Sequence, residues 1–352
     1  MNIKNIQSQL NNGEGIIVVS PENRRYLTDF PSSDGYLLIT ATESILLADS
    51  RYIEAAQNNA KDCSDIQLLS SLSSQLPALT DKLGIKTLFT EAEKLSVADF
   101  NRFSSLVSCE CKAEKADEMI CALRRIKNEY EKNKIVEAQR IAEAAFDRIL
   151  GFIKEGVTEK QVALELDYYM LSHGAECVSF ETIAVSGKNS SMPHGVPSDK
   201  KIEKGDFITM DFGAVVDGYH SDMTRTVAVG EVSSKQAEVY ETVLSAQLAS
   251  LDAVRSGVSC FDADEAARSI IRNAGYGEFF GHGTGHGVGI EIHEQPRLSL
   301  KSKQTLEVGD IVTVEPGIYL PSQFGVRIED MAFVTENSCE NLTNSPKQLI
   351  IL

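Results

Sequence analysis

Two carboxylates stand in a stretch of sequence that otherwise has the pattern of β-strands. The segment ITMDFGAVVDGYHSDMTRT, residues 208–226, predicts two strands joined by a turn. Asp211 interrupts the apolar residues of the first strand, and Asp222 opens the second. Burial of an unpaired carboxylate is costly, so both acids need a positive partner if these strands belong to a core.

An internal repeat places a third acid in an equivalent position. Residues 202–213, IEKGDFITMDFG, align with residues 306–317, LEVGDIVTVEPG, and Asp211 then matches Glu315. Two copies related by a pseudo-two-fold axis would bring these strand-end carboxylates together at the centre of the unit that they build.

Each copy also supplies a second acid downstream, Asp222 in the first and Glu329 in the second. Four carboxylates that converge in a largely dry centre would repel one another, and some would take up protons unless cations neutralised them. Two divalent metal ions balance four carboxylates. The acids therefore predict a site for two divalent metal ions.

Histidines support this interpretation. His282, His286 and His293 lie close together in the glycine-rich segment GHGTGHGVGIEIHE. One imidazole and four carboxylates form a mostly hard, oxygen-rich ligand set, which suits Mn²⁺ and accepts Co²⁺, Fe²⁺ or Zn²⁺. We expect no such role for His173, near a predicted helix C-terminus, or for His220, which we take as structural.

Each signal alone has an ordinary structural explanation. A single Asp in a strand is usually a hairpin or edge residue, and glycine-rich turns around histidines are common. The alignment of the acids across the repeat makes the joint pattern much stronger. The remaining acids of the repeat precede the strands and are expected to be turn and solvent residues; they are Glu203, Asp206, Glu307 and Asp310.

Composition bounds the class of protein. A length of 352 residues favours two domains, and a net charge of −17 argues against a nucleic-acid partner. Seven cysteines without a CxxC pair fit a reducing compartment. No apolar run approaches the length of a membrane span, and the first residues lack a signal-peptide core. We therefore expect a cytoplasmic protein without a membrane partner.

The positions of short apolar runs and helical stretches divide the chain. Residues 1–122 alternate predicted strands (GIIVVS, YLLIT, SILLAD) with predicted helices, which indicates a smaller α/β domain. A long charged helical stretch follows over residues 121–156, and the second domain is predicted as residues 123–352. Within it, residues 156–175 echo residues 257–276, each with a Thr or Ser placed to cap an amphipathic helix. The second domain thus reads as two helix-plus-hairpin halves.

At these residues the chain resembles the proline-peptidase branch of the pita-bread metallopeptidases, the Xaa-Pro aminopeptidase and prolidase type. RRYLTDFPSSDGYLLIT and LLADSRYIEAA resemble the creatinase-type N-terminal domain. The resemblance covers essentially the whole chain. It implies an α+β fold in which two pseudosymmetric halves surround a curved antiparallel sheet, preceded by the α/β domain. It also implies a homodimer.

The resemblance also implies roles for individual residues. Carried over by position, the metal ligands are Asp211, Asp222, His286, Glu315 and Glu329, with Asp222 and Glu329 bridging both ions. His194, in SMPHG, and His293 match active-site histidines, and His293 is the one that contacts the substrate carbonyl. His282 matches a histidine typical of proline-cleaving members, and Arg327 matches an arginine next to the bridging Glu329.

The implied reaction is hydrolysis of the bond between an N-terminal residue and proline. A hydroxide bridging two metal ions would be the nucleophile, and Glu315 would carry its proton to the leaving nitrogen. Whether dipeptides or longer peptides are the substrates depends on a cation or wall at the far side of the pocket, which these patterns do not locate.

Three other readings share the fold. An aminopeptidase without proline specificity, such as methionine aminopeptidase, has the same ligands, but it needs no creatinase-type domain and His282 is atypical of it. Creatinase lacks the metal set. A catalytically inactive binding protein on this fold would usually have lost ligands, and all five are present.

Overall fold

The chain forms two units, residues 1–124 and 125–352, in a computed structural model that describes residues 2–113 and 115–352. The predicted boundary near residue 122 lies within helix α6 (Lys115–Arg125). No helix in the described residues combines the length and apolar composition that a membrane span requires.

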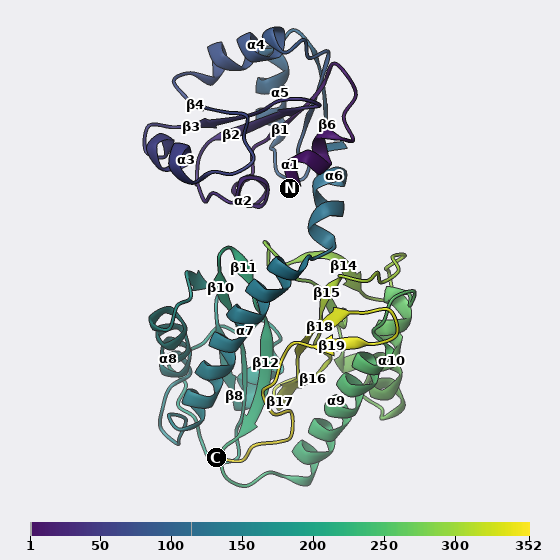
Figure 1. The fold of residues 1–352 in the computed structure, drawn as a ribbon. Coiled ribbons are helices and arrows are strands. Elements are labelled where there is room, and N and C mark those ends of the chain that lie inside the picture. Colours follow the sequence, from purple (N-terminus) through teal and green to yellow (C-terminus); the bar gives the residue numbers. More distant parts are fainter. Residues whose placement is uncertain (1, 114) are drawn as a thin grey trace. The chain divides into compact units, whose positions relative to one another are not determined.

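The first unit is built on one mixed sheet of six strands in the order β4-β3-β2-β1-β5-β6 (Figure 1). Helices α4 and α5 supply Leu76 and Phe103 to a core that they share with Ile17 and Leu38 of the sheet. The three predicted strands are present, and the helical stretches RYIEAAQNNA and SSLSSQLPALTDKLG form α3 and α4. The elements are α1 (Asn2–Gln7), β1 (Glu14–Val18), α2 (Pro21–Thr28), β2 (Tyr36–Thr40), β3 (Ser44–Ala48), α3 (Ile53–Asn59), β4 (Asp65–Leu68), α4 (Leu72–Lys82), β5 (Thr87–Thr90), α5 (Val97–Leu106), β6 (Glu110–Ala113) and α6.

The long helix predicted over residues 121–156 is wrong as a single element. Helix α6 ends at Arg125, and α7 (Glu129–Leu150) begins three residues later. Asn128 starts α7 with a capping box, because its side chain accepts from the Glu131 N–H while the Glu131 carboxylate accepts from the Asn128 N–H. The same Asn-x-x-Glu pattern is present in the sequence and marks a helix start at this position.

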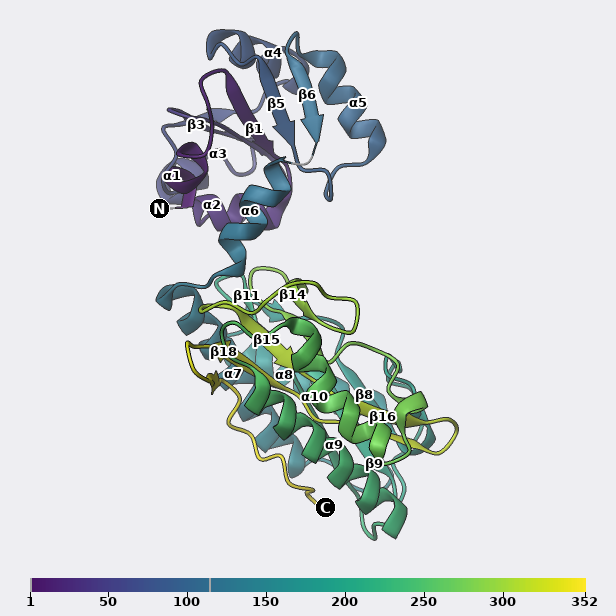
Figure 2. The same cartoon turned by 90° about the vertical axis from the view of Figure 1, so that its right-hand side faces the viewer.

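The second unit is made of two matching halves, as the repeat predicts. Helices α7 and α8 lie on one side of its strands and α9 and α10 on the other (Figures 1 and 2). Its remaining elements are α8 (Glu159–Ser172), β7 (Cys177–Val178), β8 (Ile183–Ser186), η1 (Gly187–Ser191), β9 (Phe207–Phe212), β10 (Ala214–Val216), β11 (Tyr219–His220), β12 (Met223–Ala228), α9 (Ser234–Ala253), α10 (Cys260–Asn273), η2 (Gly277–Phe279), β13 (Gly285–Gly287), β14 (Glu294–Leu298), β15 (Ile311–Val314), β16 (Gly317–Leu320), β17 (Phe324–Arg327), β18 (Asp330–Val334) and β19 (Cys339–Asn341).

The helices of the two halves begin in the same way. Helices α8 and α10 each have 14 residues, and the side chains of Thr158 and Ser259 cap them by accepting the N–H of the third helical residue. The two caps confirm the helix starts expected from the repeat.

The segment 208–226 has four strands instead of the two predicted. β9 pairs with β12, but the chain leaves this sheet at Gly213 and forms the β10–β11 hairpin before it returns. A Cβ atom at Gly213 would lie 2.0 Å from the Ser221 carbonyl oxygen, so only glycine allows this crossing. The crossing leaves Asp222 directly before β12 and sets Asp211 opposite Thr224.

The second half repeats this plan with β15 and β18 joined through the β16–β17 hairpin. Its strands form the antiparallel sheet β14-β13-β15-β18-β19, while the first half forms β12-β9-β8. The two halves are joined at the centre, where the Glu329 N–H donates to the Thr224 carbonyl at 3.1 Å. Strand ends that carry acids therefore meet between the halves.

The prediction that Asp310 faces solvent is wrong. It is fully buried, and the Arg125 guanidinium binds both of its oxygens at 2.8 Å. Asp310 also accepts the Glu307 N–H at 2.8 Å, and its counterpart Asp206 accepts the Glu203 N–H at 3.0 Å. Both acids do close the expected turns, but tertiary packing then covers Asp310.

A second buried ion pair lies behind the meeting point of the halves. Asp330 and Arg225 are almost fully buried and are joined at 2.8 Å. Arg225 also donates to the carbonyl oxygens of Thr224 at 2.9 Å and Glu329 at 2.6 Å. The pair therefore fixes the backbone of both strands that carry central acids.

Substitution Asp330→Ala should destabilise the second unit by about 3–5 kcal/mol, because it leaves the Arg225 charge buried without its partner. Urea unfolding followed by circular dichroism measures this change. The control is Asp199→Asn, in the exposed pair with Lys160, which should cost no more than about 1 kcal/mol. Equal effects of the two substitutions would contradict a structural role for the buried pair.

Candidate metal centre

One pocket of about 560 Å³ in the second unit contains all the predicted site residues. Its polar lining comes from both halves and comprises Glu181, Thr182, His194, Asp211, Asp222, His282, His286, His293, Arg297, Ser299, Glu315, Arg327 and Glu329. Apolar walls are supplied by Phe180, Ile183, Val196, Pro197, Ile292 and Leu298.

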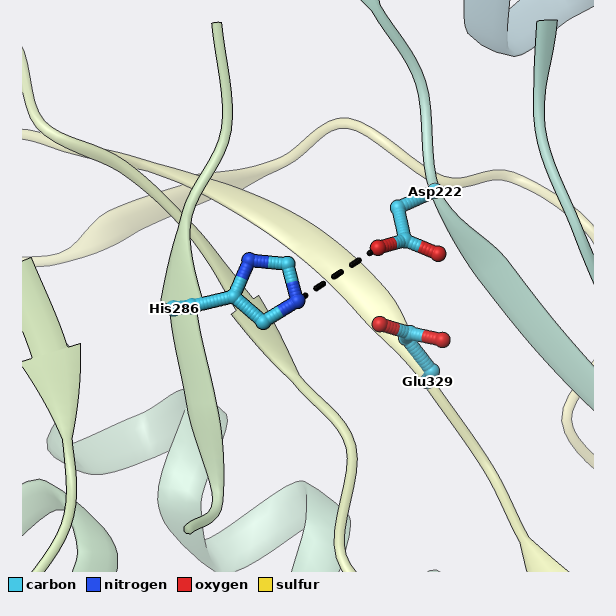
Figure 3. A group of neighbouring side chains, drawn as sticks. All are labelled: Asp222, His286 and Glu329. Atoms are coloured by element: carbon cyan, nitrogen blue, oxygen red, sulfur yellow. Dashed lines mark ion pairs between the residues drawn. The ribbon is translucent and has the colours of Figure 1, made fainter. Parts of the chain in front are cut away.

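Asp222, His286 and Glu329 line this pocket, and their side chains point toward one another (Figure 3). One potential ligand atom from each lies within 4.8 Å of the other two, and all three side chains are buried. His286 Nε2 lies 3.6 Å from Asp222 Oδ2 and 3.4 Å from Glu315 Oε1. These spacings leave room for a cation between the donor atoms.

The His286 ring is placed by a close approach of two backbones. His286 lies on β13, and a Cβ atom at the preceding Gly285 would lie 1.9 Å from the Thr313 carbonyl oxygen. Thr313 Oγ1 accepts the His286 N–H at 3.0 Å and donates to Glu315 Oε1 at 3.3 Å. His286 Nδ1 lies 3.1 Å from the Gly287 carbonyl oxygen, a contact in which Nδ1 donates and Nε2 keeps its lone pair for a cation.

Arg327 is the buried cation behind the acids. It contacts Asp211 Oδ2 at 2.5 Å and donates to Thr224 Oγ1 at 3.0 Å, and Thr224 in turn donates to Glu329 Oε2 at 2.7 Å. Arg327 therefore reaches Glu329 through the Thr224 hydroxyl, whereas it contacts Asp211 directly. One guanidinium thus orients an acid from each half.

Two carboxylate oxygens in this group have no donor. Asp211 Oδ1 and Glu329 Oε1 are buried and without a hydrogen-bond partner, although their companion oxygens are bound. Buried acceptors are rarely left unpaired. Free carboxylate oxygens beside an imidazole nitrogen are the donors that hard divalent cations prefer, so the side chains fit the predicted metal ions.

The pKa values of the site residues in the metal-free chain also indicate that negative charge is unfavourable in this pocket. Burial and the neighbouring acids raise the pKa values of Asp222 and Glu329 well above their usual range. Burial, opposed by Arg327 and reinforced by Asp211, raises the pKa of Glu315 to about 8. Burial lowers the pKa of His286 to about 3, so this imidazole is neutral and available as a ligand.

The other predicted histidines differ in their settings. The His293 ring meets the His286 ring edge-on at 4.4 Å between centroids. His282 Nε2 lies 2.9 Å from the Tyr319 hydroxyl, and burial lowers its pKa to about 4. His194 is exposed at the pocket. His173 caps the end of α8, and His220 contacts Ser179 at 2.8 Å outside the pocket lining.

Several site residues were not identified from the sequence. Thr313 recurs in the repeat as the partner of Thr209, which was a usable signal. Tyr319, whose hydroxyl accepts from Arg327 at 2.9 Å, and Thr224 had no local signal because their partners are distant in sequence. Arg297 follows His293 closely, but its place in the pocket depends on the pairing of β13 with β14.

Comparison with known proteins assigns both units. Residues 133–336 match the family model described as metallopeptidase family M24, and residues 7–126 match that of the creatinase/prolidase N-terminal domain.

Full-length relatives and structures agree with these matches. The solved Xaa-Pro dipeptidase from Bacillus anthracis is 41% identical, with a TM-score of 0.96 and coverage of 100% of this chain and 99% of that one. The solved X-Pro aminopeptidase from Thermotoga maritima is 37% identical, with a TM-score of 0.91 and coverage of 99% and 100%. The Xaa-Pro dipeptidase of Pyrococcus furiosus is 36% identical over 97% of this chain and 96% of its own length. The predicted resemblance and fold are confirmed.

The pKa of Glu315 predicts how the metal-free chain responds to pH. Because folding raises this pKa from 4.5 to about 8, the folded state keeps a proton that the unfolded state releases, and stability falls as pH rises between these values. His286 acts in the opposite direction, because folding lowers its pKa from 6.5 to about 3 and stability therefore rises with pH. This rise ends near pH 6.5, where the unfolded state has also lost the proton. From about pH 6.5 to pH 8 the metal-free chain should lose about 2 kcal/mol through Glu315.

Thermal unfolding of chelator-treated protein over this range measures the loss. The variant Glu315→Gln should show a smaller decrease, since it cannot release the proton. The same pH dependence in both proteins would show that Glu315 does not titrate in this range.

Substitution Asp222→Asn should weaken metal binding at least about tenfold, because even residues that only orient ligands cost that much. Elemental analysis after gel filtration measures the bound metal. Asp217→Asn is the matched control in the same hairpin, because Asp217 pairs with Lys134 outside the pocket lining and its φ of 50° suits Asn. Wild-type metal content in Asp222→Asn would remove Asp222 from the ligand set.

Proposed function

The chain belongs to metallopeptidase family M24, and we propose that it cleaves the bond between an N-terminal residue and proline with two bound divalent metal ions. The observation that carries this proposal is the group of buried, donor-free carboxylate oxygens beside a neutral imidazole in a pocket of substrate size. The proposed ligands are Asp211, Asp222, His286, Glu315 and Glu329. Relatives named Xaa-Pro dipeptidase and X-Pro aminopeptidase support the choice of substrate class.

When bound, the metal ions would lower the pKa of a water molecule and polarise the scissile carbonyl group. The remaining steps belong to the chain. Glu315 accepts the proton of the attacking water and delivers it to the proline nitrogen, a transfer for which a carboxylate needs a pKa near the working pH. His293, beside His286, donates to the carbonyl oxygen as negative charge develops there.

Three further side chains would shape the pocket for proline. His194 and His282 line it together with His293, and the Tyr319 hydroxyl fixes the ring of His282 at 2.9 Å. Proline has no N–H and a fixed φ, so a site shaped to its ring needs apolar contact and no acceptor for an amide proton. The walls of Phe180 and Leu298 supply such contact.

Arg297 favours a dipeptide over a longer peptide. It lines the pocket, and within the described ranges its guanidinium makes no hydrogen bond or ion pair with another side chain. It lies opposite His286 in the β13–β14 pairing, close to the reacting centre. A guanidinium without an ion-pair partner suits the terminal carboxylate of an Xaa-Pro dipeptide, and we propose Arg297 for this role. We therefore propose an Xaa-Pro dipeptidase; manganese, a homodimer and a cytoplasmic location stay predictions.

The test compares kcat/KM for a dipeptide Leu-Pro, a tetrapeptide Leu-Pro-Ala-Ala and a control Leu-Ala, with Mn²⁺ present. We expect Leu-Pro to be preferred and Leu-Ala to be negligible. Substitution Arg297→Leu should raise KM for Leu-Pro about tenfold or more, because a charge-assisted hydrogen bond is lost, and should leave the tetrapeptide unaffected.

Two results would contradict this proposal. Cleavage of Leu-Ala as fast as Leu-Pro would exclude proline specificity, and faster cleavage of the tetrapeptide would indicate an aminopeptidase. A wild-type response of Arg297→Leu would remove Arg297 from substrate recognition.

A further inference from the structure

A buried carboxylate outside the pocket holds the segment that carries His194. Glu159 is the first residue of α8 and is only 1% exposed. Its Oε1 accepts from the Ser186 N–H at 2.6 Å and the Ser186 hydroxyl at 3.0 Å. Its Oε2 accepts from the Ser198 N–H at 3.0 Å and the Ser198 hydroxyl at 2.6 Å. The Asn189 amide donates to both oxygens at 3.1 and 3.2 Å.

These three partners span the segment 186–198, which starts at the end of β8 and lines the pocket through residues 193–197. Within the described residues, no hydrogen bond holds the His194 ring itself. Its position therefore depends on the backbone on either side, which Glu159 clamps at both ends. A further tie near the middle is the bond from Arg327 to the Pro193 carbonyl at 3.2 Å.

The other half of the unit shows that the helix itself does not need this carboxylate. The position that matches Glu159 in α10 is Cys260. Both residues donate their N–H to a carbonyl group upstream of the following strand, Glu159 to Lys200 and Cys260 to Gln304. The two helices have the same length and equivalent caps, so the acid at this position is specific to the half that carries His194.

We propose that Glu159 is a positioning residue for the proposed peptidase reaction, which it supports by fixing the segment 186–198 and thereby the place of His194 in the pocket. The carboxylate touches neither the substrate nor the acids of the metal centre. It acts through His194, so its removal matters for the reaction only while His194 is present.

A double-mutant cycle tests this dependence with the holoenzyme and an Xaa-Pro substrate. Glu159→Gln keeps the shape of the side chain but turns one acceptor into an NH₂ group that faces donors. We expect kcat to fall about 10- to 100-fold, the effect of a misplaced catalytic group, with little change in KM. In the His194→Ala background the same substitution should change kcat by less than about twofold, because coupled residues are not additive. An equal loss in both backgrounds would show a merely structural role and overturn the proposal.

Thr158→Ala is the matched control. It removes the cap of the same helix but none of the bonds to the segment, so kcat should stay within about twofold of wild type even if thermal stability falls. If Glu159→Gln does not fold, Ser198→Ala loosens the clamp from the other side. It should lower kcat in the same direction and by a smaller factor, and unchanged kcat would overturn the proposal.

Proteolysis gives a readout that needs no peptidase activity. Lys188 lies exposed inside the segment, and trypsin should cleave after it faster in Glu159→Gln than in wild type or Thr158→Ala. Equal rates in the three proteins would overturn the clamp, whatever the substrate. Absence of Xaa-Pro cleavage by the wild type would instead contradict the proposed function while leaving this result intact.

Discussion

Repulsion between buried carboxylates is the constraint on which the catalytic unit depends. Asp222, Glu315 and Glu329 lie in one pocket with Asp211, and burial together with the charges of neighbouring acids raises the pKa values of the first three. Arg327 supplies one compensating charge and is already bound to Asp211. The oxygens left without a donor mark where further positive charge belongs. Without cations these acids keep protons, and the divalent cations expected of a metallopeptidase would take the place of those protons.

The two halves of the second unit place these acids next to one another. Each half brings one acid at a strand end and a second acid after a short hairpin, and glycine positions allow the strands to come close enough. Threonine hydroxyls then connect neighbours: Thr224 joins Arg327 to Glu329, and Thr313 joins His286 to Glu315. Behind them the pair Arg225–Asp330 holds the backbone of both strands. Rigidity at the site thus comes from ordinary hydrogen bonds of the sheet and its side chains.

The two halves differ in the segments that they contribute to the pocket. The first half adds the segment with His194, which Glu159 anchors, whereas Cys260 occupies the matching place in the second half. In the second half β13 pairs with β15 as β8 pairs with β9, and β14 is the additional strand; these two strands and the loop between them bring His286, His293 and Arg297 to the same pocket. The symmetric acids therefore supply four of the five proposed metal ligands and His286 on β13 supplies the fifth, while the segment with His194 and the residues around β14 line the rest of the pocket. This division explains why the repeat alone points to metal chemistry but not to a substrate.

The sequence by itself determined the features that neighbouring residues control. Helix caps at Thr158 and Ser259, the strands with Asp211 and Glu315 and the pairing of acids across the repeat all follow from local pattern. Only the tertiary structure decided the burial of Asp310, the relay from Arg327 through Thr224, the free guanidinium of Arg297 and the clamp of Glu159. These contacts join residues far apart in the chain or depend on strand pairing. Local periodicity indicates on which face of its helix or strand a side chain lies. It does not indicate which residue distant in sequence will contact that side chain in the folded protein.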